Sequence, residues 1–518
     1  MKTLKSYVCG QWFEASSGFS SLFDPATEQE IARASTAGVD FGAVLAHARE
    51  QGLPALQAMT FRERAELVKG LSKVIRDHRD ELLDLSRQNT GTTIPDGAFD
   101  VDGASGTLAF YAALGKGLGD SPFVIDGEST QQSRSGEVVG QHVFVPRRGV
   151  AVHVNAFNFP LWGFAEKAAC SLLAGMPVVT KPATATALVT ERCIELIVAA
   201  GILPTGALQL LTGNTGDLLD RLGPFDVLAF TGSADTARGL KARGRILEAC
   251  TRVNVEADSL NAAVLGPDVA PGSATFDLFV RDVVREMTQK TGQKCTAVRR
   301  ILAPAVQLGA VREALAESLG RVVTGNAADP AVTMGPLATA SQLADSLSGL
   351  AELAAEARMV VGQAARADGV GSPAGKGWFL APVLLEAADA RSSPAVHRRE
   401  VFAPVATLLP YDGSAAEAAA LVTLAEGTLV TSVYTDDGGW LAPFAAVAGA
   451  ATGRIYIGCE AAAAEAPGSG AAFPQNLHGG PGRAGGGEEL GGLRGLALYL
   501  QRVALQGGKG LISALTAA

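Results

Sequence analysis

The spacing of hydrophobic and polar residues changes several times along the chain. Residues 7–35 form short runs broken by turn residues, a pattern typical of short strands. Thr60 and Glu63 then form a capping-box pattern that opens an amphipathic segment, and residues 97–118 continue as helix. The apolar positions of the amphipathic segment recur at helical spacing: Leu67, Leu71, Val74, Ile75, Leu82 and Leu85. The first part of the chain is therefore predicted to open with strands and to continue as helices.

From Gly149 onward, short apolar runs alternate regularly with helix-like segments. The strand-like runs are 150–154, 178–180, 207–211, 227–231, 253–256 and 262–265. The helix-like segments are 161–174, 185–200, 218–222 and 236–249. Apolar strands that alternate with capped helices predict an α/β fold with a doubly wound parallel sheet. Such a sheet binds ligands at the carboxyl ends of its strands.

Three other regions depart from this regular alternation. Residues 276–460 repeat it less regularly, which predicts a second α/β domain. Residues 120–147 are polar and β-like, and we interpret them as an excursion that pairs with another subunit. The glycine-rich residues 467–495 have two interpretations, a flexible linker or an ordered loop whose backbone passes close to a site.

Length, composition and charge narrow the class of protein. The chain has 518 residues, so two or three domains are expected. Hydrophobic residues make up 47% and charged residues 18%, as in soluble globular proteins. The net charge of −9 argues against a broad nucleic-acid-binding surface. No apolar run approaches the ~20 residues that span a bilayer, and the N-terminus lacks the apolar core of a signal peptide. We therefore expect no membrane partner and a cytoplasmic location.

The cysteines and histidines show no pattern of disulfides or metal ligands. The six cysteines are dispersed without a CxxC pair, and the six histidines lack metal-ligand spacing, so no metal is expected. Most cysteines should be small buried side chains, and His153 is expected to pack in the core.

Two residues are candidates for chemistry because of their positions in the chain. Cys295 follows a glycine turn after the helix-like run 276–288, and Glu256 ends a strand-like run. Neither residue alone indicates a function, so the assignment depends on the other motifs in the chain.

Four further stretches supply that context. Phe157–Pro160, Thr180–Thr184 and Phe230–Ser233 follow strands of the regular part, and Glu400–Val405 lies in the second domain. In this order, with Glu256 and Cys295 between the last two, the stretches closely resemble the aldehyde dehydrogenase superfamily. The resemblance extends from Gly10-Gln11-Trp12 to Glu489 and therefore covers nearly the whole chain. The combination of stretches is specific, although each one alone is not.

The resemblance implies three structural parts. Residues 1–120 and 147–258 would form a dinucleotide-binding domain on the doubly wound sheet, and residues 259–480 an α/β catalytic domain. Residues 121–146 and 481–518 would form a small β bridging and oligomerisation element. That element implies a homodimer, or a tetramer made of two dimers.

Parts of the chain resemble a smaller group within the superfamily. The stretch Glu256–Asn261 departs from the ELGGK-type sequence usual after this glutamate. Gly292–Thr296 and the tract from His478 to Arg494 are similar to two dehydrogenases. One is the dehydrogenase half of the bifunctional phenylacetate-pathway ring-opening protein, and the other belongs to the aerobic benzoyl-CoA pathway. The second resemblance is stronger, because the chain has no room for a hydratase domain after Ala518. It implies that the substrate is a CoA-linked aldehyde, 3,4-dehydroadipyl-CoA semialdehyde, in benzoate degradation.

The resemblance assigns the chemistry to Cys295, Asn158 and Glu256. Cys295 would add to the aldehyde carbonyl as a thiolate, giving a thiohemiacetal and, after hydride loss, a thioester. The Asn158 side-chain N–H and the Cys295 backbone N–H would hold the oxyanion, and one such donor is worth ~3–4 kcal/mol of the barrier. Glu256 would activate water to release the acid, and it is also a candidate for deprotonating the thiol. The presence of Glu256 favours hydrolysis over transfer to free CoA.

Three charged residues near these positions have open roles. Lys167 and Glu489 match positions linked to proton relay around the general base. Otherwise Lys167 is a solvated helix lysine and Glu489 a structural partner within the glycine-rich tract. Lys294 either favours the thiolate of its neighbour Cys295 or points away from it.

The resemblance also assigns a nicotinamide cofactor. Lys181 would bind the adenosine ribose and Glu400 the nicotinamide ribose, with Phe402 supporting the nicotinamide ring. Gly232 and Ser233 would approach the pyrophosphate at a helix N-terminus. Thr184 stands where NAD-preferring relatives often carry a glutamate that repels a 2′-phosphate, so NADP is favoured. The alternative is that Thr184 is only a helix N-cap and that NAD is accepted too. Further cofactor-binding positions are Phe157, Ala183 and Gly213.

Other functions remain as alternatives at this point. Within the same class, the substrate could be another aliphatic or CoA-linked semialdehyde, such as the phenylacetate-pathway intermediate. A cysteine acyl hydrolase would need Cys295 and Glu256 but no nicotinamide contacts, and Lys181, Glu400 and Phe402 argue against it. A silent binding or scaffold protein would not need Cys295, Glu256 and Asn158.

Overall fold

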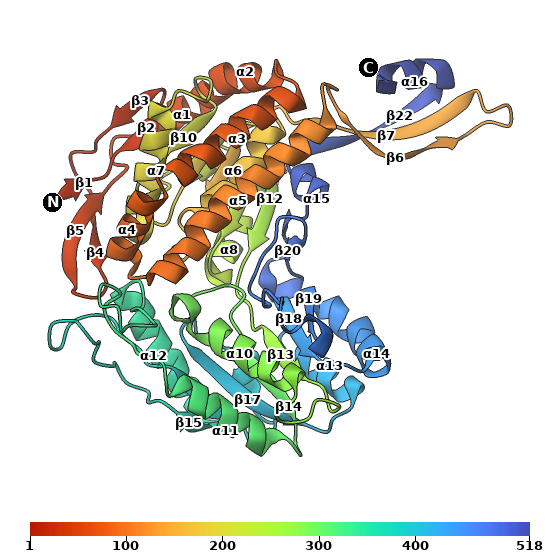
Figure 1. The fold of residues 1–518 in the computed structure, drawn as a ribbon. Helices are drawn as coiled ribbons and strands as arrows, with labels where there is room; N and C mark the ends of the chain where they lie inside the picture. The colour runs from red at the N-terminus through yellow and green to blue at the C-terminus, as the bar shows by residue number, and fades with distance from the viewer. Residues whose placement is uncertain (518) are drawn as a thin grey trace.

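A computed structural model describes residues 1–517 of the chain (Figure 1). Its first large sheet has seven strands in the order β12-β11-β8-β9-β10-β2-β3. The strands from β12 to β10 are parallel, whereas β2 and β3 are added antiparallel at one edge. The bounds are β12 Arg252–Glu256, β11 Val227–Thr231, β8 Ala151–Val154, β9 Val178–Lys181, β10 Leu208–Leu210, β2 Ser6–Val8 and β3 Gln11–Phe13.

Helices cover both faces of this sheet because its strands are apolar on both sides. Ala151 and Val178 face a core with α3 (Phe61–Asp77), α5 (Ile94–Leu118), α6 (Trp162–Leu173) and α7 (Ala187–Ala199). Their chain neighbours Val152 and Val179 face the opposite core, with α1 (Phe41–His47), α8 (Ala234–Lys241) and α9 (Gly244–Glu248). Side chains alternate across a strand, so both faces must be buried. The predicted α/β class with a doubly wound parallel sheet is confirmed.

The second large sheet also has seven strands, in the order β15-β16-β17-β14-β13-β18-β19. All neighbours except β15 pair in parallel. The bounds are β15 Arg358–Val361, β16 Val383–Glu386, β17 Val405–Tyr411, β14 Arg300–Pro304, β13 Ala262–Leu265, β18 Thr428–Tyr434 and β19 Thr452–Gly458. One face packs on α10 (Ala274–Thr288) and α11 (Leu308–Leu319), and the other on α12 (Ala340–Ala354), α13 (Ala415–Thr423) and α14 (Gly438–Ala448).

A three-stranded arm projects away from the body at the upper right of Figure 1. Its strands β6 (Val124–Gln131) and β7 (Val138–Pro146) form a hairpin, and β22 (Leu500–Gly508) adds to β7. The helix α16 (Lys509–Ala517) follows β22. The arm thus joins residues 124–146 to the C-terminal segment. Ala518, the last residue of the predicted bridging element, lies outside the described residues.

The remaining elements are shorter or lie at the periphery. A small N-terminal sheet has the order β1-β5-β4, with bounds Lys2–Thr3, Gln29–Ala34 and Ser20–Asp24. The helices α2 (Leu53–Gln57), α4 (Arg79–Thr90) and α15 (Leu493–Ala497) complete the described helices. Within residues 1–517, no helix has both the length and the apolar character needed to cross a membrane.

The glycine-rich region is ordered and lies between the two large sheets. It contains the hairpin of β20 (Leu477–Gly479) and β21 (Glu488–Leu490). A Cβ atom on Gly485 or Gly487 would come within 2.3 or 2.4 Å of the Val255 carbonyl oxygen. Only glycine allows so close an approach to β12. The flexible-linker interpretation is therefore wrong, and the alternative of an ordered loop is confirmed.

The predicted helix over 236–249 is also wrong in detail. The segment forms two helices, α8 and α9, separated at Ala242 and Arg243. Arg243 has an extended backbone (φ −64°, ψ 127°), and Gly244 begins the second helix. Glycine has a low helix propensity, so the continuous helical pattern could not be maintained through this point.

Candidate active site

The loop that carries Cys295 has a strained backbone. It follows α10 and a short helical turn (Gln289–Gly292) in which Lys290, Thr291 and Gly292 all have positive φ, 52°, 58° and 66°. Non-glycine residues in this region cost about 1–3 kcal/mol each and persist where their surroundings hold them. Here the Thr291 hydroxyl donates to the Gly335 carbonyl (2.9 Å), and the Lys290 ammonium lies 4.2 Å from the centre of the Phe159 ring. The predicted glycine turn before Cys295 is confirmed.

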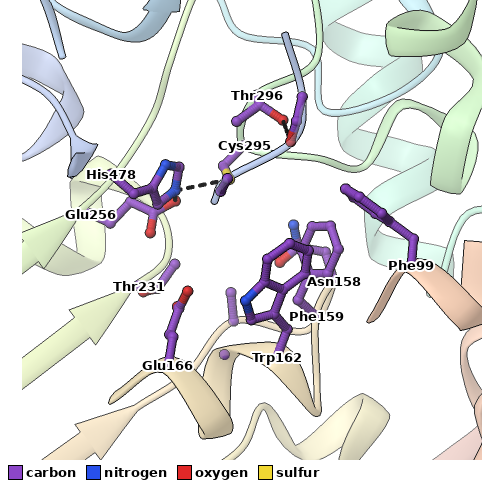
Figure 2. A pocket seen from close by; sticks show the side chains of 14 residues that line it. Phe99, Asn158, Phe159, Trp162, Glu166, Thr231, Glu256, Cys295, Thr296 and His478 are labelled. Carbon is purple, nitrogen blue, oxygen red and sulfur yellow. Dashed lines mark hydrogen bonds and ion pairs between the residues drawn. The ribbon is translucent and has the colours of Figure 1, made fainter. Parts of the chain in front are cut away.

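Cys295, Asn158 and Glu256 line a single pocket (Figure 2). Glu256 is the last residue of β12, and Asn158 lies between β8 and α6. The pocket thus forms at the carboxyl ends of neighbouring parallel strands, where such sheets place their ligands. Its other lining residues are mostly apolar or small: Phe99, Ala156, Phe159, Trp162, Gly163, Glu166, Thr231, Thr296, Gly470, Ala472 and His478. The structure brings together the nucleophile, base and oxyanion donor that the sequence predicts.

His478 lies in direct contact with both reactive groups, and sequence reasoning missed it. Its Nε2 atom is 3.7 Å from Cys295 Sγ and 3.2 Å from Glu256 Oε1. The side chain comes from β20 and is buried. The tract beginning at His478 was noted only as part of the resemblance. Its position beside Glu489 in the β20–β21 pairing is the feature that joins it to the site.

A buried cluster of charges lies behind Glu256. Lys167 Nζ lies 2.9 Å from Glu166 Oε1 and 3.1 Å from Glu489 Oε2. The other oxygen of Glu489 accepts a hydrogen bond from Asn254 Nδ2 (3.2 Å). Lys167 and Glu489 are only 2% and 6% exposed, so the interpretation of Lys167 as a solvated lysine is wrong. Glu166, which also lines the pocket, was not predicted from the sequence.

Lys294 points away from its neighbour Cys295. Its ammonium lies 2.6 Å from Glu286 Oε2 and donates to Gln289 Oε1 (2.7 Å). A buried carboxylate on α10 thus neutralises this lysine and fixes its direction. Lys294 thus forms a structural ion pair, and its charge still lowers the pKa of Cys295, against the larger effects of burial and Glu256.

The predicted adenosine-side residues lie at the carboxyl end of β9. Lys181 is the last residue of β9, and Ala183 and Thr184 follow it. The Thr184 hydroxyl donates to the Gly213 carbonyl (3.3 Å), so these two loops touch. The N-cap position of the next helical turn is Ala183, and it makes no side-chain cap bond. The alternative of Thr184 as a helix N-cap is therefore wrong.

The predicted pyrophosphate-side residues lie at the N-terminus of α8. The Gly232 N–H donates to the Glu256 carbonyl (3.2 Å), and the Ser233 hydroxyl caps α8 by accepting from Thr236 N–H. The Asp258 carboxylate accepts from Ala234 N–H (2.9 Å). A pyrophosphate would therefore share this helix end with a carboxylate. The structure places Gly232 and Ser233 at a helix N-terminus, as predicted.

The predicted nicotinamide-side residues come from the segment before β17. The Phe402 and Phe157 rings meet edge to face, with centroids 5.8 Å apart. Glu400 Oε2 accepts from Ser259 N–H (3.1 Å). Arg299 Nε lies 3.6 Å from Glu400 Oε1, so this buried oxygen has no hydrogen-bond partner among the described residues. It is free to accept a hydrogen bond from a ligand hydroxyl.

Comparison with known proteins identifies the family of this site. Residues 12–502 match the model of the aldehyde dehydrogenase family. The chain belongs to this family. It is 42% identical to 3,4-dehydroadipyl-CoA semialdehyde dehydrogenase of Aromatoleum evansii, over 92% of this chain and 93% of that protein. It is 25% identical to succinate-semialdehyde dehydrogenase [NADP(+)] of Escherichia coli (strain K12), over 79% and 81% of the two chains. The protein is an NAD(P)-dependent aldehyde dehydrogenase.

Solved structures of aldehyde dehydrogenases share the fold. A 3,6-anhydro-L-galactose dehydrogenase in complex with NAP matches with a TM-score of 0.84 at 22% identity, covering 98% of this chain and all of that one. Betaine aldehyde dehydrogenase of Staphylococcus aureus in complex with NAD+ matches with a TM-score of 0.83 at 24% identity, over 98% and 95% of the chains. These matches confirm the predicted aldehyde dehydrogenase-like fold.

The departure of Glu256–Asn261 from the usual aldehyde dehydrogenase sequence has a structural role. Asn261 Nδ2 donates to the carbonyls of Cys295 (2.7 Å) and Ala297 (2.9 Å). The Ser259 hydroxyl in turn donates to Asn261 Oδ1 (2.6 Å). The two side chains therefore anchor the cysteine loop to the segment that joins β12 to β13.

The pocket of this aldehyde dehydrogenase disfavours a free thiolate. Burial raises the pKa of the Cys295 thiol well above its usual value, and the Glu256 carboxylate raises it further. Burial also raises the pKa of Glu256, but the charges of His478 and Lys167 outweigh burial and lower this pKa to about 2. Burial raises the pKa of Glu166 to about 7, with Lys167 opposing. The resting site therefore holds a thiol beside an ionised carboxylate.

The predicted cofactor residues have environments suited to a polar ligand. Burial lowers the pKa of Lys181 to about 8, so its charge lacks full solvation. Burial raises the pKa of Glu400 to about 7, with Arg299 opposing. The Lys181 ammonium could donate to a ribose oxygen, and the Glu400 carboxylate could accept from a ribose hydroxyl, which would compensate both groups.

Proposed function

We propose that this enzyme oxidises 3,4-dehydroadipyl-CoA semialdehyde to the carboxylic acid with NADP, in aerobic benzoate degradation. The observation that carries the reaction type is the placement of Cys295, Asn158 and Glu256 around one buried pocket. The substrate rests on the 42% identity to the Aromatoleum evansii enzyme of that name.

In this mechanism, Cys295 Sγ bonds to the aldehyde carbon while the carbonyl oxygen takes the negative charge. The Asn158 side chain and the Cys295 backbone N–H hold that oxygen. Bound NADP would accept the hydride, which leaves an acyl thioester on Cys295. Glu256 then takes a proton from the water that attacks the thioester, and the acid is released. Lys167, Glu489 and Glu166 would pass that proton away from Glu256.

The pocket favours an acid as the product. The Glu256 carboxylate lines the pocket together with Cys295, where it would accept a proton from water. Members of the family that transfer the acyl group to CoA commonly lack this base. CoA would therefore be part of the substrate and not the acyl acceptor.

The residues present fit a nicotinamide dinucleotide. Lys181, Ala183, Thr184 and Gly213 would hold the adenosine ribose and its 2′-phosphate, and Gly232 with Ser233 the pyrophosphate. Glu400, through its unpartnered Oε1, would accept from the nicotinamide ribose, and Phe402 with Phe157 would support the ring. Thr184 supports NADP, because its hydroxyl offers a donor where a carboxylate would repel the phosphate.

The Thr184→Glu variant should change cofactor preference. A carboxylate at this position would repel the 2′-phosphate of NADP and accept from the 2′-hydroxyl of NAD, so the ratio of kcat/KM for NADP to that for NAD should fall by about tenfold or more, ~1.4 kcal/mol. The Thr184→Ser variant keeps the hydroxyl and serves as the control. An unaltered ratio in Thr184→Glu would show that other residues set the preference.

The substrate proposal is tested by kcat/KM for a CoA-linked semialdehyde and for free aliphatic aldehydes, from absorbance at 340 nm. We expect the CoA-linked aldehyde to have the higher value. A higher value for the free aldehydes, or for the phenylacetate-pathway semialdehyde, would contradict this substrate and leave the reaction type in place. Ester or thioester hydrolysis without any aldehyde oxidation would instead favour a cysteine acyl hydrolase.

We also propose the assembly and the division of the chain. The arm of β6, β7 and β22 would bridge subunits in a homodimer or a dimer of dimers. Residues 1–120 and 147–258 would act as the cofactor domain, residues 259–480 as the catalytic domain, and residues 121–146 and 481–518 as the bridging element. Removal of the arm hairpin should lower the mass measured by light scattering. Cytoplasmic location and the expectation of no metal stay predictions.

A further inference from the structure

His478 faces the nucleophile and the general base with the same ring atom. Nε2 lies 3.7 Å from Cys295 Sγ and 3.2 Å from Glu256 Oε1, and one side-chain atom from each of the three residues lies within 4.8 Å of the other two. Figure 2 shows the imidazole and the carboxylate on the same side of the sulfur. An atom in this position can exchange a proton with either neighbour.

The backbone around His478 is tightly packed. A Cβ on Gly479 would lie 2.1 Å from the Gly487 carbonyl oxygen, and one on Gly453 would lie 1.7 Å from the Gly479 carbonyl oxygen. His478 also pairs with Glu489 across the β20–β21 hairpin. These close approaches therefore fix the backbone that carries His478 beside the pocket.

Two lysines near Cys295 are committed to carboxylates, whereas Arg299 and Arg454 also interact with the sulfur. Lys294 pairs with Glu286, and Lys167 pairs with Glu166 and Glu489. Glu256 and Glu166 add negative charge beside the sulfur, which opposes a thiolate. A cysteine in such surroundings needs a cation in contact to ionise. His478 is the side chain placed to become that cation.

We propose that His478 accepts the Cys295 thiol proton on Nε2, so that attack on the aldehyde begins from a thiolate–imidazolium pair. This inference rests on the proposed function and divides its acid–base chemistry between two residues. His478 serves the thiol, and Glu256 serves the water that hydrolyses the thioester.

The proton balance closes over one turnover. The S–H bond breaks, the proton moves to Nε2, and sulfur bonds to the carbonyl carbon while the C=O electron pair moves to oxygen. The electron pair on oxygen then re-forms the C=O bond as the hydride leaves the carbon. The nicotinamide would take up this hydride, so the cofactor is reduced and the aldehyde carbon is oxidised. Water then adds to the thioester and gives its proton to Glu256. The departing thiolate recovers the proton from His478, and Glu256 releases its proton to solvent.

The groups around His478 favour its protonated form, the imidazolium of the proposed pair. Four groups face the His478 ring from different elements: Glu256 at the end of β12, Cys295 in its loop, Glu166 on α6 and Arg454 on β19. Burial lowers the pKa of His478, but Glu256 outweighs burial and raises it, with Arg454 opposing. The charge of His478 is in turn the main cause that lowers the pKa of Glu256, so the two groups act as a coupled pair.

The test compares His478→Gln with His142→Gln, an exposed histidine on the β7 strand of the arm. The first measurement is the rate of Cys295 alkylation by iodoacetamide against pH, with the modified residue located by mass spectrometry. The second is the hydride burst at 340 nm in a single turnover. In His478→Gln, both should fall about 10²-fold or more at neutral pH, the usual contribution of a general base. The alkylation profile should also move to higher pH, which loss of packing alone would not cause.

Each outcome separates this inference from the proposed function. A His478→Gln enzyme with the wild-type alkylation profile and burst would overturn the role of His478, even if Cys295→Ala is inactive. Retained turnover in Cys295→Ala would overturn the proposed function itself. If His478→Gln does not fold, His478→Asn replaces it in the same two measurements. Wild-type alkylation and burst in that variant would likewise overturn the role of His478.

Discussion

Cys295→Ala is expected to abolish aldehyde oxidation. The variant removes the sulfur that would form the covalent intermediate in the pocket, so kcat should fall by at least about 10⁴-fold. The loop should keep its shape, because Asn261 binds the carbonyl at position 295 and not the side chain. The measurement is NADPH formation at 340 nm with a saturating aldehyde.

Cys250→Ala supplies the matched control, since it changes an exposed cysteine in the same way. It should keep wild-type turnover. Aldehyde oxidation at the wild-type rate by Cys295→Ala would show that another group is the nucleophile, and the thiohemiacetal route would then be wrong.

Glu256→Gln is expected to separate the two halves of the reaction. The amide cannot take a proton from water, so hydrolysis of the thioester should slow by about 10²–10⁴-fold. The first hydride transfer should persist, because His478 remains beside the thiol in this variant. Rapid mixing should therefore show a burst of NADPH of about one equivalent per site, followed by slow steady-state turnover.

The accumulated thioester should be visible by mass spectrometry as an acyl adduct on Cys295. Glu248→Gln, an exposed position on α9, is the control and should show no burst. Unchanged steady-state turnover in Glu256→Gln would count against Glu256 as the hydrolytic base. Loss of the burst as well would instead assign thiol activation to Glu256 and argue against the role of His478.

Much of the fold could be predicted from the sequence because it depends on local patterns. The strands β11 and β13 occupy the ranges that their apolar runs predict, since both faces of a central parallel strand are buried. The capping box of Thr60 and Glu63 begins α3 at the expected place. The hydrophobic pattern did not predict the break between α8 and α9, because apolar residues keep their helical spacing on both sides of it.

The site followed partly from the order of its motifs. Asn158, Glu256 and Cys295 each stand at the end of a strand or after a turn, and parallel strands bring such ends to one edge. The sequence therefore determined which of these residues meet. It also determined the α/β class, through alternating strands and helices, and the nicotinamide-binding character, through a combination of stretches that is specific only as a set.

Only the tertiary structure decided the acid–base surroundings of the nucleophile. His478 lies 183 positions from Cys295, and a hairpin of glycine-rich backbone carries it into the pocket. Glu166 was one helix residue among many until its contact with Lys167 placed it at the site. The direction of Lys294 was set by Glu286 on another element. Local sequence governs backbone conformation, whereas the partner of a buried charge depends on which distant segment packs against it.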